Sequence, residues 1–424
     1  MTSLVAVLNN QAVALAADSA VTTQGPFGQK IYNTVNKLFT LSKYHPVGIM
    51  VYSSAEIMGV PIETAIKVYR ERLGTRSFDR LEEYYEDFIL FLKIEPLLFT
   101  EEARIEQCAT VIGGCLYNLR DQILRHLDTK YIGWGQPTPA QVKQTAQAFL
   151  NDQVSQFQAS AELPDANPNV RIALKNKLKP RVNQWKAQFK QDFLLSNACV
   201  ALLTDHCLDM ILRYQPTGIE TGFVIAGFGE KEYLPQLRSF EFESSVFGVH
   251  KMRAKQSADV SAQGATIVPF AQREMVDTFM RGRTHQLDNL VMNLIDGFFY
   301  GRSQEIAADP SLYAQSAEIV SFLEGMRKDL REHVREQLKE FTTQNHVGPI
   351  IETVNAMPKE ELALTAEALV NLTAIKRRAS ADAETVGGPT DVAVISKGDG
   401  FIWIKRKHYF RSEINPHFGQ NYFR

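Results

Sequence analysis

The sequence contains few cysteines, no excess of charge of either sign and no long apolar run. Its four cysteines, Cys108, Cys115, Cys199 and Cys207, form no CxxC pair and show no Cys/His ligand spacing. We therefore expect buried thiols, with neither a disulfide nor a metal site. Lys+Arg 46 against Asp+Glu 48 leaves a formal net charge of -2, which argues against a nucleic-acid partner.

The first residues lack the features of a leader or a membrane anchor. No basic segment precedes the apolar start, and Asn9, Asn10, Gln11 and Asp18 interrupt it, which argues against a cleaved signal peptide. No stretch approaches the roughly 18 apolar residues that a membrane-spanning helix requires. The sequence therefore predicts a cytoplasmic protein without membrane association. Because 45% of its residues are hydrophobic, it can bury a large core.

Strand patterns dominate the start of the chain. Two short apolar runs, 3–8 and 12–17, flank the turn sequence Asn9-Asn10-Gln11 and predict a hairpin of buried strands. The runs 31–41 and 46–52 predict two further strands.

Helical and strand patterns then follow in blocks. Apolar spacing predicts helices over most of 61–214, with Thr138 before Pro139 as a cap, and again over 270–281, 285–341 and the segment after Pro358. Strands are predicted at 220–227, 238–249, 390–396 and 400–404. Blocks of each type, rather than strict alternation, indicate a layered α+β architecture.

Thr2 is the first candidate for chemistry. It follows a methionine that processing enzymes normally remove before a small side chain, so the mature chain is expected to begin with Thr2. A threonine hydroxyl is a weak nucleophile until a base takes its proton, and an N-terminal threonine carries that base as its own α-amine. The amine has an ordinary pKa of about 7.7–8, close to working pH.

Asp18 and Lys37 are candidates to tune that amine. A nearby lysine disfavours the protonated amine, and a carboxylate beside the lysine keeps the lysine charged. Asp18 ends the second predicted strand and Lys37 lies in the third, so pairing of these strands permits both to approach the first residue, although spacing alone does not require it.

These residues resemble a known family. The stretch SLVAVLNNQAVALAADSAVTT, followed by NTVNKLFTL and PVGIMVYSSAE, looks like the opening of proteasome β-subunits and of the bacterial proteasome-like protease, which are N-terminal nucleophile hydrolases. A helix leading into ETVGGPTDVAVISKGDGFIWI is similar to the last helix, glycine pair and closing hairpin of that family. The resemblance implies a four-layer αββα sandwich with a large, mostly helical insertion.

The resemblance assigns roles to three residues by position. Thr2 falls on the threonine nucleophile, Asp18 on the motif aspartate and Lys37 on the catalytic lysine. The backbone amide of the oxyanion hole falls near Tyr52 and Ser53, where the family has glycine, and any residue except proline can supply that N–H.

Supporting residues match less closely. A turn whose serine supports the α-amine corresponds to Gly264, with Thr266 or Ala265 in place of the serine. Asp382 and Thr385 stand slightly out of register before the glycine pair. The implied segments are a first part of the core at 1–73, a helical insertion at 74–219, a second part of the core at 220–282, a second insertion at 283–356, and a final helix, closing strands and tail at 357–424.

The resulting hypothesis is a threonine-type hydrolase of peptide or other amide bonds. It implies no cofactor, a homo-oligomer, and an ATPase as a further partner. Two alternatives stay open: a catalytically silent scaffold that binds a partner through its helical insertions, and a hydrolase of small amides.

Overall fold

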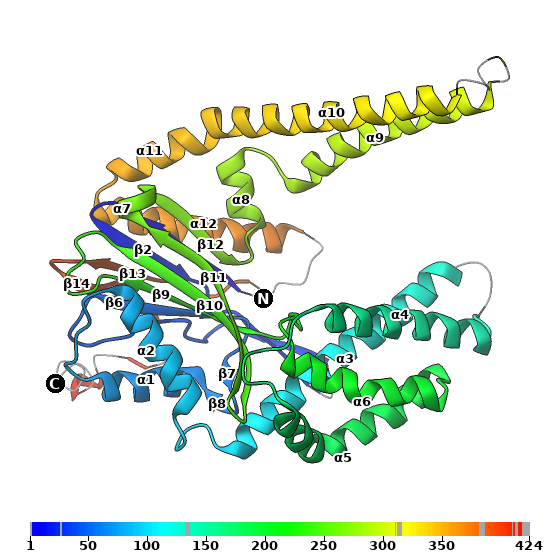
Figure 1. Ribbon diagram of the computed structural model, residues 1–424. Helices are drawn as coiled ribbons and strands as arrows, with labels where there is room; N and C mark the ends of the chain where they lie inside the picture. The colour runs from blue at the N-terminus through cyan, green and yellow to red at the C-terminus, as the bar shows by residue number, and fades with distance from the viewer. Residues whose placement is uncertain are drawn as a thin grey trace. The chain divides into compact units, whose positions relative to one another are not determined.

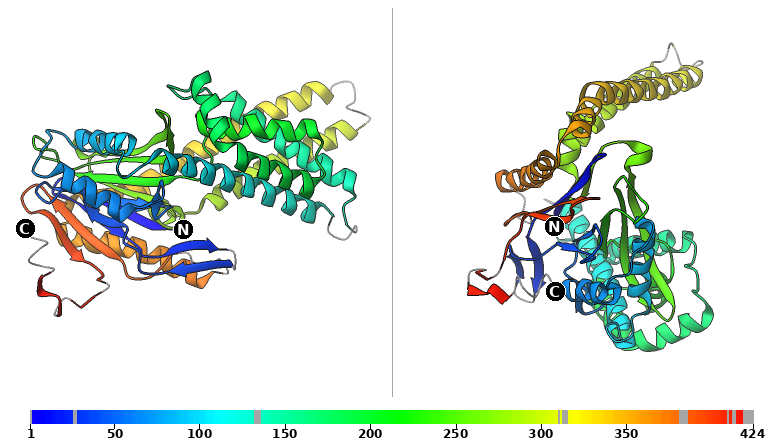
Figure 2. Two further views of the ribbon diagram at one scale, coloured as in Figure 1. Left: turned by 90° about the horizontal axis from the view of Figure 1, so that it is seen from below. Right: turned by 90° about the vertical axis from the view of Figure 1, so that its left-hand side faces the viewer.

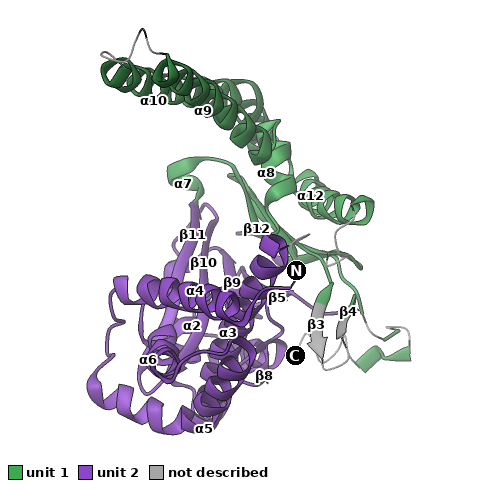
Figure 3. Ribbon diagram, turned by 90° about the vertical axis from the view of Figure 1, so that its right-hand side faces the viewer, with its two compact units in different colours: residues 1–34, 259–396, 402–424 green, residues 35–258, 397–401 purple. Residues whose placement is uncertain are grey.

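The chain folds into two compact units, coloured separately in Figure 3. Unit 1 comprises 1–34, 259–396 and 402–424, and unit 2 comprises 35–258 and 397–401. The computed structural model describes residues 2–25, 28–131, 136–309, 311, 316–380, 386–408, 410–411 and 414–417.

Unit 1 is built on a five-stranded sheet in the order β12-β1-β2-β13-β14. Its strands are β1 (Ser3–Leu8), β2 (Ala12–Ala17), β12 (Thr266–Ala271), β13 (Asp391–Ser396) and β14 (Gly400–Lys405). β1 and β2 form the predicted hairpin, and Asn9 Oδ1 accepts the backbone N–H groups of Gln11 (2.9 Å) and Ala12 (3.3 Å) in its turn. Every residue of β1 and β2 is buried, which explains their unbroken apolar sequence.

Helices cover one face of this sheet. α12 (Lys359–Ala379) lies along β1 and β2, and its buried Leu362, Ala366 and Leu369 join a core with Val5 and Val392 of the sheet. The shorter elements are α7 (Val260–Gln263), α8 (Glu274–Arg281), α11 (Gly348–Ala356) and the hairpin β3 (Val21–Gly25) with β4 (Gly28–Tyr32).

Two long helices extend from unit 1 as an antiparallel pair. α9 (His285–Ala308) and α10 (Ser316–Thr342) lie side by side along their length (Figures 1 and 2). Asp296 of α9 pairs with Arg327 of α10 at 2.8 Å and also with Arg331. A π-helix, η2 (Thr343–Val347), continues α10 towards α11.

Unit 2 contains the second sheet, in the order β11-β10-β9-β6-β5. Its strands are β5 (Leu38–Thr40), β6 (Val47–Tyr52), β9 (Thr221–Gly227), β10 (Gln236–Val246) and β11 (Val249–Asp259). α1 (Ile62–Leu73) and α2 (Leu81–Ile94) follow the short hairpin β7 (Glu56–Ile57) and β8 (Val60–Pro61). Both helices pack on one face of the sheet, where Tyr69, Phe88 and Phe91 meet Phe223 and Phe240.

A four-helix bundle forms the rest of unit 2. It consists of α3 (Glu101–Tyr131), α4 (Pro139–Ala159), α5 (Pro168–Phe193) and α6 (Asn197–Leu212), and its core includes all four cysteines. Thr138 caps α4 as predicted, since its hydroxyl accepts the backbone N–H of Gln141. The insertion expected at 74–219 thus combines α2, which packs on the sheet, with a bundle that has its own core.

The mixed α+β class with antiparallel sheets is confirmed, whereas the four-layer order stays a prediction. The strand predicted at 31–41 is wrong: β4 ends at Tyr32 and β5 begins at Leu38. Residues 270–271, predicted helical, belong to β12, and α8 begins at Glu274.

In the described part of the chain, no helix has the length and apolar character needed to cross a membrane.

Candidate active site

Asp18 lies buried at the end of β2 and holds three chain segments together. Its Oδ1 accepts the backbone N–H of Ser3 at 3.0 Å, and its Oδ2 accepts those of Ala20 at 3.2 Å and Gly387 at 3.3 Å. The bond to Ser3 is reciprocal, because Asp18 N donates to Ser3 O at 3.1 Å. The carboxylate is therefore fixed next to the residue that follows Thr2.

Thr2 stands immediately before β1 and is 5% exposed. Its carbonyl oxygen accepts the backbone N–H of Gln272 at 3.1 Å, directly after β12. The first residues are thus held on one side by β12 and on the other by Asp18. Unit 1 brings Thr2, Asp18 and the glycine pair at 387–388 to one end of its sheet.

Lys37, Tyr52 and Ser53 belong to unit 2, where they are neighbours. The backbone of Lys37 lies opposite β6, since its carbonyl accepts the N–H of Val51 at 2.9 Å, and the lysine is 5% exposed. Ser53 has a φ of 74°, in the left-handed region that non-glycine residues seldom adopt. Such a backbone conformation costs about 1–2 kcal/mol, and Ser53 is one of six non-glycine residues in the described part of the chain with a positive φ.

The side chain of Tyr52 is buried among charged groups. Its hydroxyl donates to Glu241 Oε1 at 3.2 Å, while Arg253 and Lys255 pair with Glu241 Oε2 at 2.6 and 3.1 Å. Burial first, and then the charge of Glu241, raise the pKa of Tyr52 far above its ordinary value. Tyr52 therefore stays a neutral phenol, and its backbone rather than its side chain suits an oxyanion hole.

Two of the predicted support residues lie away from Thr2. Thr266 pairs with Leu8 at the far end of β1, about 20 Å along the strand from Thr2 at roughly 3.4 Å per residue. Gly264, with a φ of 72°, ends α7 two residues earlier. The structure therefore does not bring Gly264 or Thr266 to Thr2. Asp382 and Thr385 lie outside the described residues.

Gln272 and Ser19 are the neighbours of this site that sequence reasoning missed. Gln272 bonds to Thr2 through its backbone, and its Oε1 accepts Arg377 Nε of α12 at 2.7 Å. Ser19 donates its hydroxyl to Pro389 O, and its backbone N–H donates to Gly387 O at 3.1 Å. Antiparallel pairing of β12 with β1 places Gln272 beside Thr2, whereas the apolar spacing from Phe270 onward predicts a helix.

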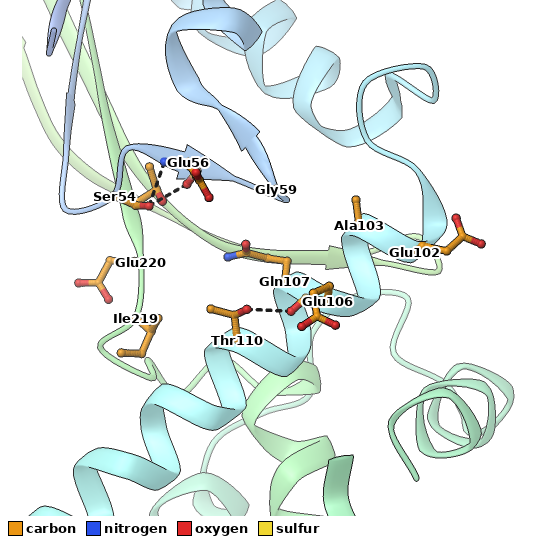
Figure 4. Close-up of a pocket in the computed structure, with 11 residues that line it drawn as sticks. Ser54, Glu56, Gly59, Glu102, Ala103, Glu106, Gln107, Thr110, Ile219 and Glu220 are labelled. Carbon is orange, nitrogen blue, oxygen red and sulfur yellow. Dashed lines mark hydrogen bonds between the residues drawn. The ribbon is translucent and has the colours of Figure 1, made fainter. Parts of the chain in front are cut away.

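Unit 2 also contains a pocket of about 580 Å³, shown in Figure 4. Its lining begins at Ser54, directly after Ser53, and includes the carboxylates of Glu56, Glu102, Glu106 and Glu220. Burial and then the nearby Glu241 and Glu243 raise the pKa of Glu220. The lining is acidic. Among the described residues, no group of three or more His, Cys, Asp or Glu side chains is arranged to hold a metal ion.

No family model matches the chain. No curated protein matches it either. Among solved structures, the chain is similar to Anbu (ancestral beta-subunit) from Yersinia bercovieri, at 9% identity over 99% of this chain and 94% of that one, with a TM-score of 0.27. A likeness this low assigns neither a fold family nor a function to the chain.

Proposed function

We propose that the chain is a threonine-type N-terminal nucleophile hydrolase that cleaves peptide or other amide bonds once Met1 is removed. The observation that carries the proposal is the buried Asp18 carboxylate, which is held by the N–H groups of Ser3, Ala20 and Gly387 beside Thr2. The resemblance of the first and last segments of the sequence to proteasome β-subunits gives this geometry its chemical interpretation.

In the proposed reaction, Thr2 Oγ attacks the amide carbonyl while the α-amine of Thr2 takes the hydroxyl proton, directly or through water. The C–N bond then breaks, the departing amine receives that proton, and an ester joins the acyl group to Thr2. Water attacks the ester with the same amine as base, which releases the acid and restores the hydroxyl. No cofactor takes part in these steps.

Lys37 and the backbone near Ser53 complete the proposal. Lys37, kept charged by Asp18, would disfavour the protonated amine of Thr2 and so keep it available as a base. The backbone N–H near Tyr52 and Ser53 would stabilise the oxyanion. Loss of such a hydrogen-bond donor raises the activation free energy by about 3–4 kcal/mol. Contact between Lys37 and Asp18 is a requirement of the proposal.

The test is covalent labelling of the purified full chain with an epoxyketone or β-lactone probe. Intact mass first establishes whether Met1 has been removed. Labelling should be lost in Thr2→Ala, retained in Thr2→Ser, and reduced at least tenfold in Lys37→Ala. Lys43→Ala is the matched control, because Lys43 is an exposed lysine six residues further on, and it should label normally.

Two results would contradict the proposal. Equal labelling of Thr2→Ala would show that another group is the nucleophile. A chain that retains Met1 and yet hydrolyses peptides would exclude the α-amine as base. Hydrolysis of small amides but not of peptides would select the narrower substrate class.

The alternative of a catalytically silent scaffold is favoured by the size of the helical additions and by the large apolar side chains that α9 and α10 expose. A chain with free Thr2 that neither labels nor hydrolyses would support it. The proposed homo-oligomer is measured by light scattering, and a partner ATPase by stimulation of hydrolysis in the presence of ATP.

A further inference from the structure

The pair of helices α9 and α10 exposes a row of large apolar side chains. Eight of them are between 41% and 67% exposed: Leu287, Leu290, Leu294 and Phe298 on α9, and Phe322, Met326, Leu330 and Phe341 on α10. On α9 they recur every three or four residues, which puts them on one stripe of the helix. We call these eight side chains the hairpin face.

Both stripes lie on the same side of the pair. Phe299 of α9 and Leu338 of α10 are less exposed than the hairpin face, and we take the side of each helix that carries them to face the other helix. On each helix, the exposed stripe is rotated about the helix axis by roughly a quarter to a third of a turn from the residues that face the other helix. The rotation has the same sense on both helices when each is viewed from its own N-terminus. Because α9 and α10 run antiparallel, these two rotations place both stripes on the same side of the pair.

The exposed positions of α9 between 286 and 300 carry no charge. They are Gln286, Leu287, Asn289, Leu290, Asn293, Leu294, Gly297, Phe298 and Tyr300. A helix surface that meets water is normally polar and charged, whereas the centre of a protein–protein interface is depleted of charge and rich in large apolar side chains. The two aspartates in this stretch, Asp288 and Asp296, are paired with arginines.

The size of the hairpin face matches one half of a dimer interface. At about 200 Å² for each fully exposed side chain, the eight residues present roughly 900 Å² of apolar surface. The largest apolar patches on monomers measure roughly 300–600 Å², and a standard interface buries about 800 Å² on each partner. A single hairpin leaves this area in water, and a second identical hairpin would cover it.

We propose that the hairpin face binds the same face of a second copy of this chain, so that two α9–α10 pairs form an antiparallel four-helix bundle. In a two-fold arrangement, the same surface serves both copies. Leu294 lies at the middle of the α9 stripe and would face Leu294 of the second copy, with Leu290 opposite Phe298. Gly297 and Gly301, around which no atom lies within 4 Å of an added Cβ, allow the two α9 helices to approach closely.

A lipid surface fits this face less well than a second copy does. Helices that lie on membranes carry Lys and Arg beside their apolar stripe. α9 has neither between 286 and 301, and Arg327 and Arg331 of α10 are paired with Asp296. The proposal does not depend on Thr2, since the hairpin face is far along the chain from it and contains no group that the hydrolysis uses.

The test is site-specific cross-linking of the full chain. Leu294→Cys should form a disulfide-linked dimer under mild oxidation, because the two-fold axis brings the residue next to its own copy. Lys328→Cys is the matched control: it is exposed on α10, on the side away from the hairpin face, and should stay monomeric. The native cysteines are all buried, so they contribute little background.

The register has its own test. A mixture of Leu290→Cys and Phe298→Cys chains should cross-link to each other at least tenfold faster than either cross-links to itself.

A charge at the centre of the face should abolish the pairing. Leu294→Glu places two carboxylates opposite each other and should raise the dimer dissociation constant at least 100-fold by sedimentation, whereas Lys328→Glu should leave it unchanged. Leu294 is 64% exposed, so the substitution should spare the fold, which circular dichroism checks. The proposal is wrong if Leu294→Cys cross-links no faster than Lys328→Cys, or if Leu294→Glu instead abolishes binding to anionic vesicles by a monomeric chain.

Discussion

Replacement of Asp18 tests the part of the candidate site that lies within one unit. In Asp18→Ala, three backbone N–H groups, those of Ser3, Ala20 and Gly387, lose a buried acceptor. Each unsatisfied buried donor costs about 1–3 kcal/mol, so the variant should lose about 3–6 kcal/mol of unfolding free energy after some relaxation. Asp18→Asn retains one acceptor oxygen, but its NH₂ group faces a backbone N–H, which is also a donor. This variant should lose about 1–3 kcal/mol of unfolding free energy.

Urea unfolding followed by circular dichroism measures the loss of unfolding free energy. Hydrogen exchange of peptides from β1, β2 and β13 shows which strands lose protection of their backbone N–H groups. Asp329→Ala is the control, since Asp329 is an exposed aspartate of the same unit and should change stability by less than about 0.5 kcal/mol. If the unfolding free energy of Asp18→Ala is within about 1 kcal/mol of that of the parent chain, the carboxylate does not hold the three segments together and the reasoning fails.

Two further predictions concern unit 2. Gly222→Ala would put a Cβ in collision with the ring of Tyr52, so it should lower the free energy of unfolding measured in urea by about 1–3 kcal/mol. The same change made in Tyr52→Ala should cost nothing further. Burial lowers the pKa of His206 from 6.5 to about 4. The unfolded chain therefore binds more protons, and stability should fall by about 3 kcal/mol as the pH drops from about 6.5 to about 4. His206→Leu should remove that part of the pH dependence in acid melts, and an unchanged slope would contradict the assignment.

The sequence predicted elements best where independent local signals agree. β1 and β2 match the predicted strands residue for residue, because continuous apolar runs and the Asn9 turn both specify them. The hairpin of β3 and β4 was missed, since VTTQG and GQKIY show no apolar alternation. The residues 31–41 were then joined into one strand, although the chain bends between Tyr32 and Leu38.

The candidate site was predictable where it lies on those well-specified strands. Thr2 and Asp18 flank β1 and β2, so their proximity follows from the hairpin register. Gly264 and Thr266 were assigned by likeness of a short turn, without the strand pairing that decides which end of β1 they reach. Because Thr266 pairs with Leu8, Gly264 and Thr266 lie near the end of β1 that is farthest from Thr2. Long-range pairing of this kind is not encoded in any local pattern.

The pairing of β2 with β13 has a consequence for the order of synthesis. Ala17 stands opposite Asp391, so the N-terminal hairpin must wait for about 370 further residues before its neighbour strand exists. At roughly 5–20 residues per second, that wait lasts about 20–75 s. Through this interval an apolar strand edge has no native partner on the ribosome, which makes the nascent chain a candidate for chaperone binding. The Asp18 to Gly387 bond cannot form until residue 387 has been synthesised, so any activity of Thr2 that depends on this bond would be absent before that point.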